Sequence, residues 1–258
     1  MPWPLPEGEA ERLALAKGYP FPAPDASFLF RDGSHRALTT AQAYDSGLFA
    51  GRTPVIAHGS NRSPEQLARK YGAAATIPVT RGWLADYDVV YSAHITQYGA
   101  VASTLHYVPG ARARISINWL DETQLARMHE TEGPSNYQYG EMAGIILDLE
   151  AGPATRLERA WIYFSKNGCL ARDGAPIGIA AVEAESRPHD ALPQEATLEH
   201  VRTKHRPESD VDAMILRAIA DKGYRQSLVE EMRAEAVPAR APHFDPDAVE
   251  PIDESIPA

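Results

Sequence analysis

The chain lacks the cysteines that a disulfide-stabilised protein needs. Its 258 residues include one cysteine, Cys169, so no intramolecular disulfide can form, and we expect Cys169 to be a small buried side chain. Basic residues are outnumbered: 25 Lys and Arg stand against 35 Asp and Glu, a formal net charge of -10. Such a surface repels nucleic acid and anionic membranes. No apolar run is long enough to span a bilayer, and the N-terminus carries no apolar signal core. We therefore expect a cytoplasmic protein without nucleic-acid or membrane partners.

Proline crowds both ends of the chain and divides it into three parts. We interpret residues 1–50 as an N-terminal extension packed on the body, 51–235 as the main domain, and 236–258 as a Pro/acid-rich tail. The pattern of the main domain is α+β, with many strands and helices outside them. Glycine and proline divide the predicted strands, which are Ile77–Val79, Tyr87–Ser92, Val101–Tyr107, Ile115–Leu120, 138–149, 156–164 and 176–184. Helices are predicted over 7–17, 38–48 and 195–234, the last with a stop at Gly223.

The segment from Thr53 to Gly72 predicts a strand, a tight loop and a helix. Val55–Ala57 is the short buried strand and His58-Gly59-Ser60-Asn61-Arg62 is the loop. Ser63 and Gln66 have the spacing of a capping box, and Pro64 stands at the first helical position, where its missing N–H does no harm. Gly72 is the predicted end of the helix.

Backbone N–H groups at Gly59, Ser60 and Asn61 would converge just before that helix. Together with the helix dipole they favour a small anion. The loop has neither the pattern of a phosphate-binding loop nor the dinucleotide fingerprint, so a carboxylate fits better than a phosphate. The alternative is an ordinary strand-to-helix turn with no ligand.

A second segment begins where Asp121 and Gln124 predict another capping box. The helix that follows ends in His129-Glu130-Thr131-Glu132-Gly133, and Tyr137 and Tyr139 come soon after. The negative end of the helix dipole and the charge of Glu130 both disfavour ionisation of Glu132. We therefore expect a raised pKa for the Glu132 carboxyl. The alternative is a solvated carboxylate at a helix end.

The two segments together resemble the gamma-glutamylcyclotransferase-like (AIG2-like) family. That family has Tyr-Gly-Ser-Asn-Leu after an apolar strand and, later, a helix that ends in Glu-Gly with a tyrosine shortly after. Between the two, Gly99–Thr104 is similar to the family's small-residue strand and Val108–Gly110 to the turn after it. The match covers roughly residues 53–150. Two departures are His58 in place of the tyrosine and Arg62 in place of the apolar residue.

The resemblance implies a mixed β-barrel flanked by helices, with a cavity between the two motifs. The first fifty residues and the tail lie outside the match, as N- and C-terminal extensions. It also implies an enzyme that needs no cofactor and acts on a small γ-glutamyl compound: the α-amine attacks the side-chain amide, giving 5-oxoproline. Glu132 would be the general acid/base. The substrate would be bound by His58, Gly59, Ser60, Asn61, Arg62 and Tyr139. No metal is expected, because none of the nine histidines has a metal-ligand spacing.

Other interpretations of the same residues stay open. Arg62 is either a partner for a second substrate carboxylate or an exposed residue at the helix start. Tyr137 and Tyr139 are either site groups or core aromatics. The protein is alternatively a non-catalytic small-carboxylate-binding or regulatory module on the same fold. A third, weaker hypothesis is a hydrolase that uses Ser60 with His58.

Overall fold

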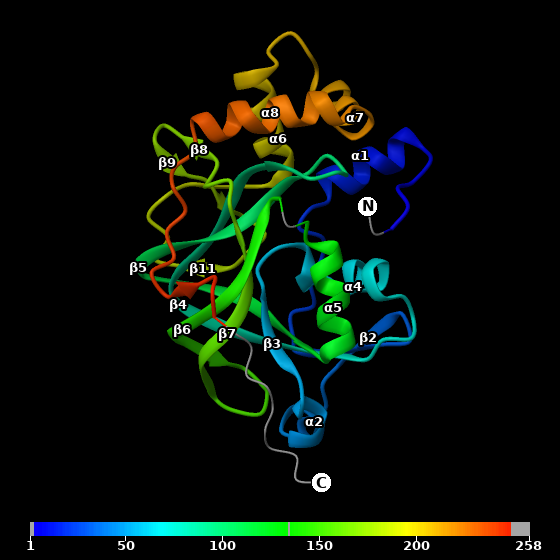
Figure 1. The fold of residues 1–258 in the computed structure, drawn as a ribbon, viewed down its shortest axis with the longest axis vertical. Coiled ribbons are helices and arrows are strands. Elements are labelled where there is room, and N and C mark those ends of the chain that lie inside the picture. The colour runs from blue at the N-terminus through cyan, green and yellow to red at the C-terminus, as the bar shows by residue number, and fades with distance from the viewer. Residues whose placement is uncertain (1–2, 134, 249–258) are drawn as a thin grey trace.

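A closed β-barrel lies at the centre of the molecule, in a computed structural model that describes residues 3–133 and 135–248. Its five strands are β3 (Thr53–Ala57), β4 (Ile77–Ile95), β5 (Val101–Leu120), β6 (Tyr137–Leu149) and β7 (Arg156–Ser165). They are hydrogen-bonded in the order β3-β5-β4-β6-β7, and β7 then pairs with β3 to close the ring. The β3–β7 pair is parallel and the others are antiparallel, so the barrel is mixed (Figure 1).

The strands β4 and β5 each run through residues where the sequence predicted two separate strands. They are joined at Gly99, which has a φ of +84°, and a break there was predicted. Pro109-Gly110 does not end a strand, so that prediction was wrong. The register shifts beside Asp86 instead, and the Gly110 N–H donates to Asp86 Oδ1 over 2.7 Å. A bulge tolerates proline because a bulged residue need not donate to the ladder.

Two helices, α4 (Pro64–Tyr71) and α5 (Glu122–Thr131), lie side by side on the outside of the barrel (Figure 1). Successive side chains of β3 point to opposite faces. Val55 therefore joins a buried cluster with Leu67 of α4 and Leu125 of α5, whereas Ile56 joins the larger core cluster. Because β3 packs against both of these clusters, the loop that follows β3 begins beside α4 and α5. The predicted α+β class, a mixed barrel flanked by helices, is confirmed.

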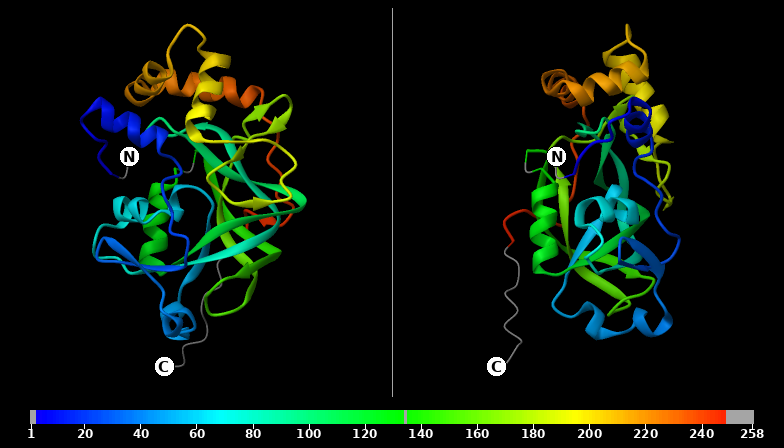
Figure 2. Two further views of the ribbon diagram at one scale, coloured as in Figure 1. Left: turned by 180° about the vertical axis from the view of Figure 1, so that it is seen from behind. Right: turned by 90° about the vertical axis from the view of Figure 1, so that its right-hand side faces the viewer.

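A group of helices covers one end of the barrel (Figures 1 and 2). It consists of α1 (Glu9–Lys17), α6 (Gln194–His205), α7 (Val211–Ala220) and α8 (Lys222–Ala234). The N-terminal helix α1 packs against α6 and α7, and Lys17 pairs with Asp212 of α7 over 2.6 Å. Among the residues that the structure describes, no helix combines the length and the apolar character needed to cross a membrane.

The predicted N-terminal extension contributes to the barrel sheet. Strand β1 (Phe28–Arg31) pairs antiparallel with β4 and with β2 (Ser34–Ala37), and no strand was predicted at this hairpin. The helix predicted over 38–48 is in fact two short helices, α2 (Thr40–Ala43) and α3 (Ser46–Phe49). Asp45 interrupts them because its carboxylate caps α3 through the Gly47 N–H.

The strand predicted over 176–184 is wrong in its length. The chain from 171 to 192 holds two-residue strands instead, which are β8 (Ala171–Arg172), β9 (Ala175–Pro176), β10 (Gly178–Ile179), β11 (Ala184–Glu185) and β12 (Ala191–Leu192). Beside them Cys169 is buried, as expected. In the predicted tail, β13 (Phe244–Asp245) pairs with β6, and residues 249–258 lie outside the described residues.

Helix ends agree with the sequence where a side chain makes the capping bond. The box predicted at Asp121 and Gln124 forms in both directions, and Gly72, with a φ of +67°, ends α4 as predicted. The box predicted at Ser63 was wrong, because Ser63 makes no capping bond and Gln66 accepts from Arg69 instead. The stop predicted at Gly223 was also wrong: Asp221 ends α7 and caps α8.

The contrast between the two caps gives a stability prediction. We expect Asp121→Ala to lower the free energy of unfolding by about 1 kcal/mol, because it removes a capping hydrogen bond to the helix that carries Glu132. Ser63→Ala is the matched control, since the Ser63 hydroxyl is buried without a partner among the described residues, and we expect it to cost nothing. Urea denaturation measures both, and equal losses would contradict this account.

Candidate active site

The loop after β3 lies between the barrel and the end of α5. It consists of His58, Gly59 and a 3-10 turn, η1 (Ser60–Arg62). A Cβ atom on Gly59 would overlap the hydroxyl oxygens of Ser103 and Tyr19, so only glycine fits there. The first N–H groups of such a turn have no acceptor within it, and no backbone acceptor in the described chain pairs with the Ser60 or Asn61 N–H.

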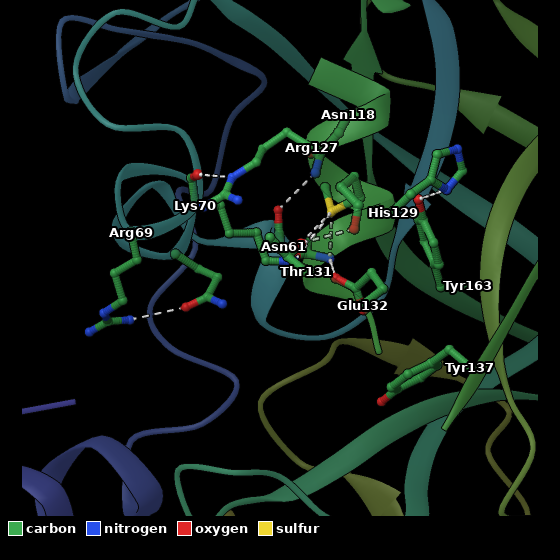
Figure 3. Close-up of polar contacts among 12 residues, drawn as sticks. Asn61, Arg69, Lys70, Asn118, Arg127, His129, Thr131, Glu132, Tyr137 and Tyr163 are labelled. Atoms are coloured by element: carbon green, nitrogen blue, oxygen red, sulfur yellow. Dashed lines mark hydrogen bonds and ion pairs between the residues drawn. The ribbon is translucent and has the colours of Figure 1, made fainter. Parts of the chain in front are cut away.

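Glu132 stands at the C-terminal end of α5, where it is the C-cap residue. The side-chain amide of Asn61 donates to Glu132 Oε1 over 2.8 Å, so the two sequence motifs are in contact. Lys70, from the last turn of α4, forms an ion pair with the same oxygen. Figure 3 shows Asn61 and Lys70 reaching this carboxylate. Their contact is largely closed to solvent, since the Lys70 and Glu132 side chains are 2% and 15% exposed.

The electrostatics of Glu132 differ from the sequence-based expectation. Burial raises the pKa of the carboxyl, but the charge of Lys70 and the hydrogen bonds from Asn61 and Lys70 together outweigh burial and lower it. The expected raised pKa was therefore wrong. Glu130 is not the cause that we expected, because it is 65% exposed and pairs with Arg127 over 2.6 Å. Glu132 is ionised at neutral pH.

A cavity of about 420 Å³ opens beside Glu132, a size suited to a small molecule. The N-terminal segment, the loop, the β4–β5 turn and the end of α5 all contribute to it, through Trp3, Tyr19, Ser60, Lys70, Tyr98 and Glu132 among others. A second cavity, of about 40 Å³, is lined by His58, Gly59, Asn61, Ser103 and Glu132. Ser60, Tyr19, Tyr137 and Glu132 line both cavities. The carboxylate of Glu132 is therefore reached from both.

His58 belongs to a buried chain of hydrogen bonds. Its Nδ1 lies 2.9 Å from Ser103 Oγ and its Nε2 lies 3.4 Å from the Tyr163 carbonyl oxygen. Burial lowers the pKa of His58 to about 4, so the ring is neutral at neutral pH. With Nε2–H donating to the carbonyl, Nδ1 accepts from Ser103, whose Oγ accepts from the Tyr19 hydroxyl over 2.6 Å. The serine in contact with His58 is thus Ser103 and not Ser60, which weakens the hydrolase hypothesis.

The remaining predicted site residues lie elsewhere. Tyr139 stacks on Trp161 with ring centroids 5.1 Å apart and lines neither cavity, whereas Tyr137 lines both. Arg62 is 8% exposed, so its interpretation as an exposed residue was wrong. Arg62 also lines neither cavity beside Glu132, and faces a third one instead.

Two groups at the site were missed in the sequence. Lys70 follows Gln66 by four residues and Leu67 by three, so it shares their buried helix face, and a lysine on that face was the available clue. Tyr19 comes from the N-terminal segment, far from both motifs along the chain, and no local pattern connects it with Gly59.

Comparison with protein-family models, with curated proteins and with solved structures finds no match for this chain. Within residues 3–133 and 135–248, no group of three His, Cys, Asp or Glu side chains is arranged to hold a metal ion. The site is therefore assessed on its own geometry.

Two buried histidines give a prediction for the pH dependence of stability. Burial lowers the pKa values of His58 and His94 from 6.5 to about 4. Between these values the unfolded chain binds protons that the folded chain does not, so the free energy of unfolding rises with pH. Stability should fall from pH 6.5 to pH 4. Each of His58→Gln and His94→Gln should reduce the slope by about 1.4 kcal/mol per pH unit.

Urea denaturation at several pH values measures this slope. The variant His35→Gln, at an exposed position on β2, is the control and should leave the slope unchanged. An identical slope in wild type and in all three variants would show that His58 and His94 do not cause the pH dependence of stability.

Proposed function

We propose that this chain is an enzyme of the gamma-glutamylcyclotransferase type, with the corresponding fold. It would convert a γ-glutamyl compound into 5-oxoproline and a free amine or amino acid. The observation that carries the proposal is the 2.8 Å hydrogen bond from Asn61 to Glu132, because it joins the two motifs of the resemblance beside one cavity of about 420 Å³. The closed mixed barrel flanked by helices supports the same proposal.

The reaction needs the substrate folded back on itself. In our proposal the loop amides from Gly59 to Asn61 bind the substrate α-carboxylate and hold its α-nitrogen near Glu132. Fixing both groups makes the attack intramolecular and oriented, which supplies a large share of a rate enhancement. Tyr137 replaces Tyr139 as the proposed aromatic contact with the substrate, because Tyr137 lines the cavity.

Glu132 is the proposed carrier of protons between the two nitrogens. The α-ammonium gives a proton to Glu132, and the free amine then forms a bond to the γ-carbonyl carbon while the bond from that carbon to the leaving nitrogen breaks. The α-nitrogen starts with three hydrogens and ends with one, in the ring N–H. The leaving nitrogen gains those two protons and departs as an ammonium group, so the balance closes without a cofactor.

Lys70 sets the resting state of that acid/base group. Its ammonium keeps Glu132 ionised, which a proton acceptor must be. A carboxylate with a lowered pKa is also a weaker base. The substrate ammonium must therefore compete with Lys70 for Glu132, and the contact between Lys70 and Glu132 has to loosen as the substrate binds.

The same ion pair favours a second candidate function, a module that binds a small carboxylate without turnover. A buried carboxylate already neutralised by Lys70 needs no proton from a ligand. The departure from the family pattern at His58, where the family has tyrosine, also favours a binding module. Saturable binding of a γ-glutamyl dipeptide in calorimetry, with no 5-oxoproline formed, would support this candidate over the enzyme.

The Glu132→Gln variant tests the enzymatic proposal directly. We expect wild-type protein to release 5-oxoproline from at least one member of a panel of γ-glutamyl amino acids and amines. Glu132→Gln should reduce kcat/KM by about 10²- to 10⁴-fold, because it removes the proton carrier. Glu130→Gln, two residues away and exposed, is the matched control and should retain full activity. Undiminished turnover in Glu132→Gln, or no product from any substrate, would refute the proposal.

The Lys70→Met variant tests the role of the ammonium. Removing that charge removes the largest of the interactions that lower the pKa of Glu132, while burial still raises it. The acidic limb of the profile of kcat/KM against pH should therefore move to higher pH, by about one unit or more. Lys222→Met, at an exposed position on α8, should leave the limb in place. If the acidic limb does not move in Lys70→Met, Lys70 does not control the ionisation of the acid/base group.

A further inference from the structure

A third cavity, of about 360 Å³, lies where the chain from Gly18 to Asp25 passes over the barrel. Two arginines line it: Arg62, at the end of the loop after β3, and Arg81 of β4. They are 8% and 6% exposed, so both guanidinium groups have lost most of their contact with water. This cavity has Tyr19 in common with both cavities beside Glu132, but its other lining residues differ from theirs. The third cavity is therefore a separate site.

The charge of Arg62 is not balanced by the residues described around it. Its Nε and Nη1 atoms are buried and have no hydrogen-bond partner in residues 3–133 and 135–248. Burial, and then the charge of Arg81, lower the pKa of the Arg62 guanidinium to about 10. A buried cation without a counter-ion destabilises a protein strongly. Repulsion between the charges of Arg62 and Arg81 adds to that cost.

The acidic side chains in the cavity wall do not neutralise the pair. Asp25 lies 3.4 Å from Arg81, but its side chain is fully exposed, at 105%, so water screens its charge. Glu183 is 58% exposed and bonds to Arg114 over 3.0 Å. The second contact of Arg81 is a neutral one, to the Pro24 carbonyl oxygen over 3.0 Å. The buried part of the cavity wall therefore keeps an excess of positive charge, from Arg62 and Arg81.

We propose that this cavity is a binding site for a small oxyanion, a carboxylate or phosphate group held between Arg62 and Arg81. Guanidinium groups present paired N–H donors that match the paired oxygens of both anions. The volume exceeds that of a single phosphate, so the group can belong to a larger molecule. This inference does not depend on the proposed cyclotransferase activity.

Titration calorimetry and thermal denaturation test the site with two probes, inorganic phosphate and malonate. Sodium chloride at equal ionic strength corrects for screening. We expect saturable binding and a rise in Tm with at least one probe, and the probe that acts identifies the oxyanion class. Arg62→Met and Arg81→Met should each weaken binding about tenfold or more, since each removes charge-assisted hydrogen bonds.

Controls separate this site from others and from unfolding. Arg62→Lys keeps the charge but lacks the paired donors, so it should bind the probe more weakly than wild type does. This variant replaces Arg62→Met in the test if Arg62→Met does not fold. Arg159→Met, 70% exposed on β7, should retain binding. Without ligand, Arg62→Met should be as stable as wild type or more stable, because an unbalanced charge has gone. Absence of binding to both probes, or undiminished binding in folded Arg62 variants, would overturn the proposal.

Discussion

The contact of Glu132 with Lys70 and Asn61 is the interaction on which the candidate site depends. Taking a carboxylate and an ammonium out of water costs several kcal/mol for each ion, and that cost is offset only when the pair is close and its other donors are satisfied. Asn61 supplies the additional hydrogen bond. Loss of any one partner leaves a buried charge or an unsatisfied donor. The contact therefore fixes the distance between the loop after β3, the end of α4 and the end of α5.

The N-terminal segment completes the site that this contact organises. Tyr19 places its hydroxyl against Gly59 and Ser103, and Trp3 adds to the wall of the larger cavity. The segment is held in place by α1, which packs on the C-terminal helices. Parts of the chain that lie outside the two sequence motifs therefore shape the cavity. A ligand that enters it meets aromatic rings from the N-terminal segment and charges from the main domain.

Local patterns in the sequence were sufficient for the features that depend on neighbouring residues. The Asp121 box and the Gly72 stop follow from short-range hydrogen bonds and backbone conformation, and both were predicted. The failures had long-range causes. Ser63 has the right spacing for a cap, but its N–H donates to the Ser60 carbonyl oxygen and the Gln66 side chain accepts from Arg69, so the reciprocal bond of the box does not form. Pro109 ends no strand, because it lies in a bulge of β5 opposite Asp86 of the partner strand β4.

The candidate site shows the same division between local and distant effects. The family resemblance implied a cavity between the two motifs, and the hydrogen bond from Asn61 to Glu132 brings those motifs together. The direction of the Glu132 pKa was predicted wrongly, because the helix dipole and Glu130 are local terms and Lys70 is brought in by the packing of α4 on α5. Arg62 was misjudged for a related reason: nothing near it in sequence indicates that residues 18–25 pass over it.

Buried cations also reconcile the acidic composition with the proposed binding of anions. A net charge of -10 repels a carboxylate at long range, but salt screens that field beyond about 8 Å at physiological ionic strength. Inside a cavity, where water is largely excluded, a nearby cation acts with far less screening. Lys70 stands in such a place, and so do Arg62 and Arg81. Lys70 is already balanced by Glu132, whereas Arg62 is not balanced by any described neighbour. The overall charge therefore governs how often an anion arrives, and the local imbalance governs where it stays.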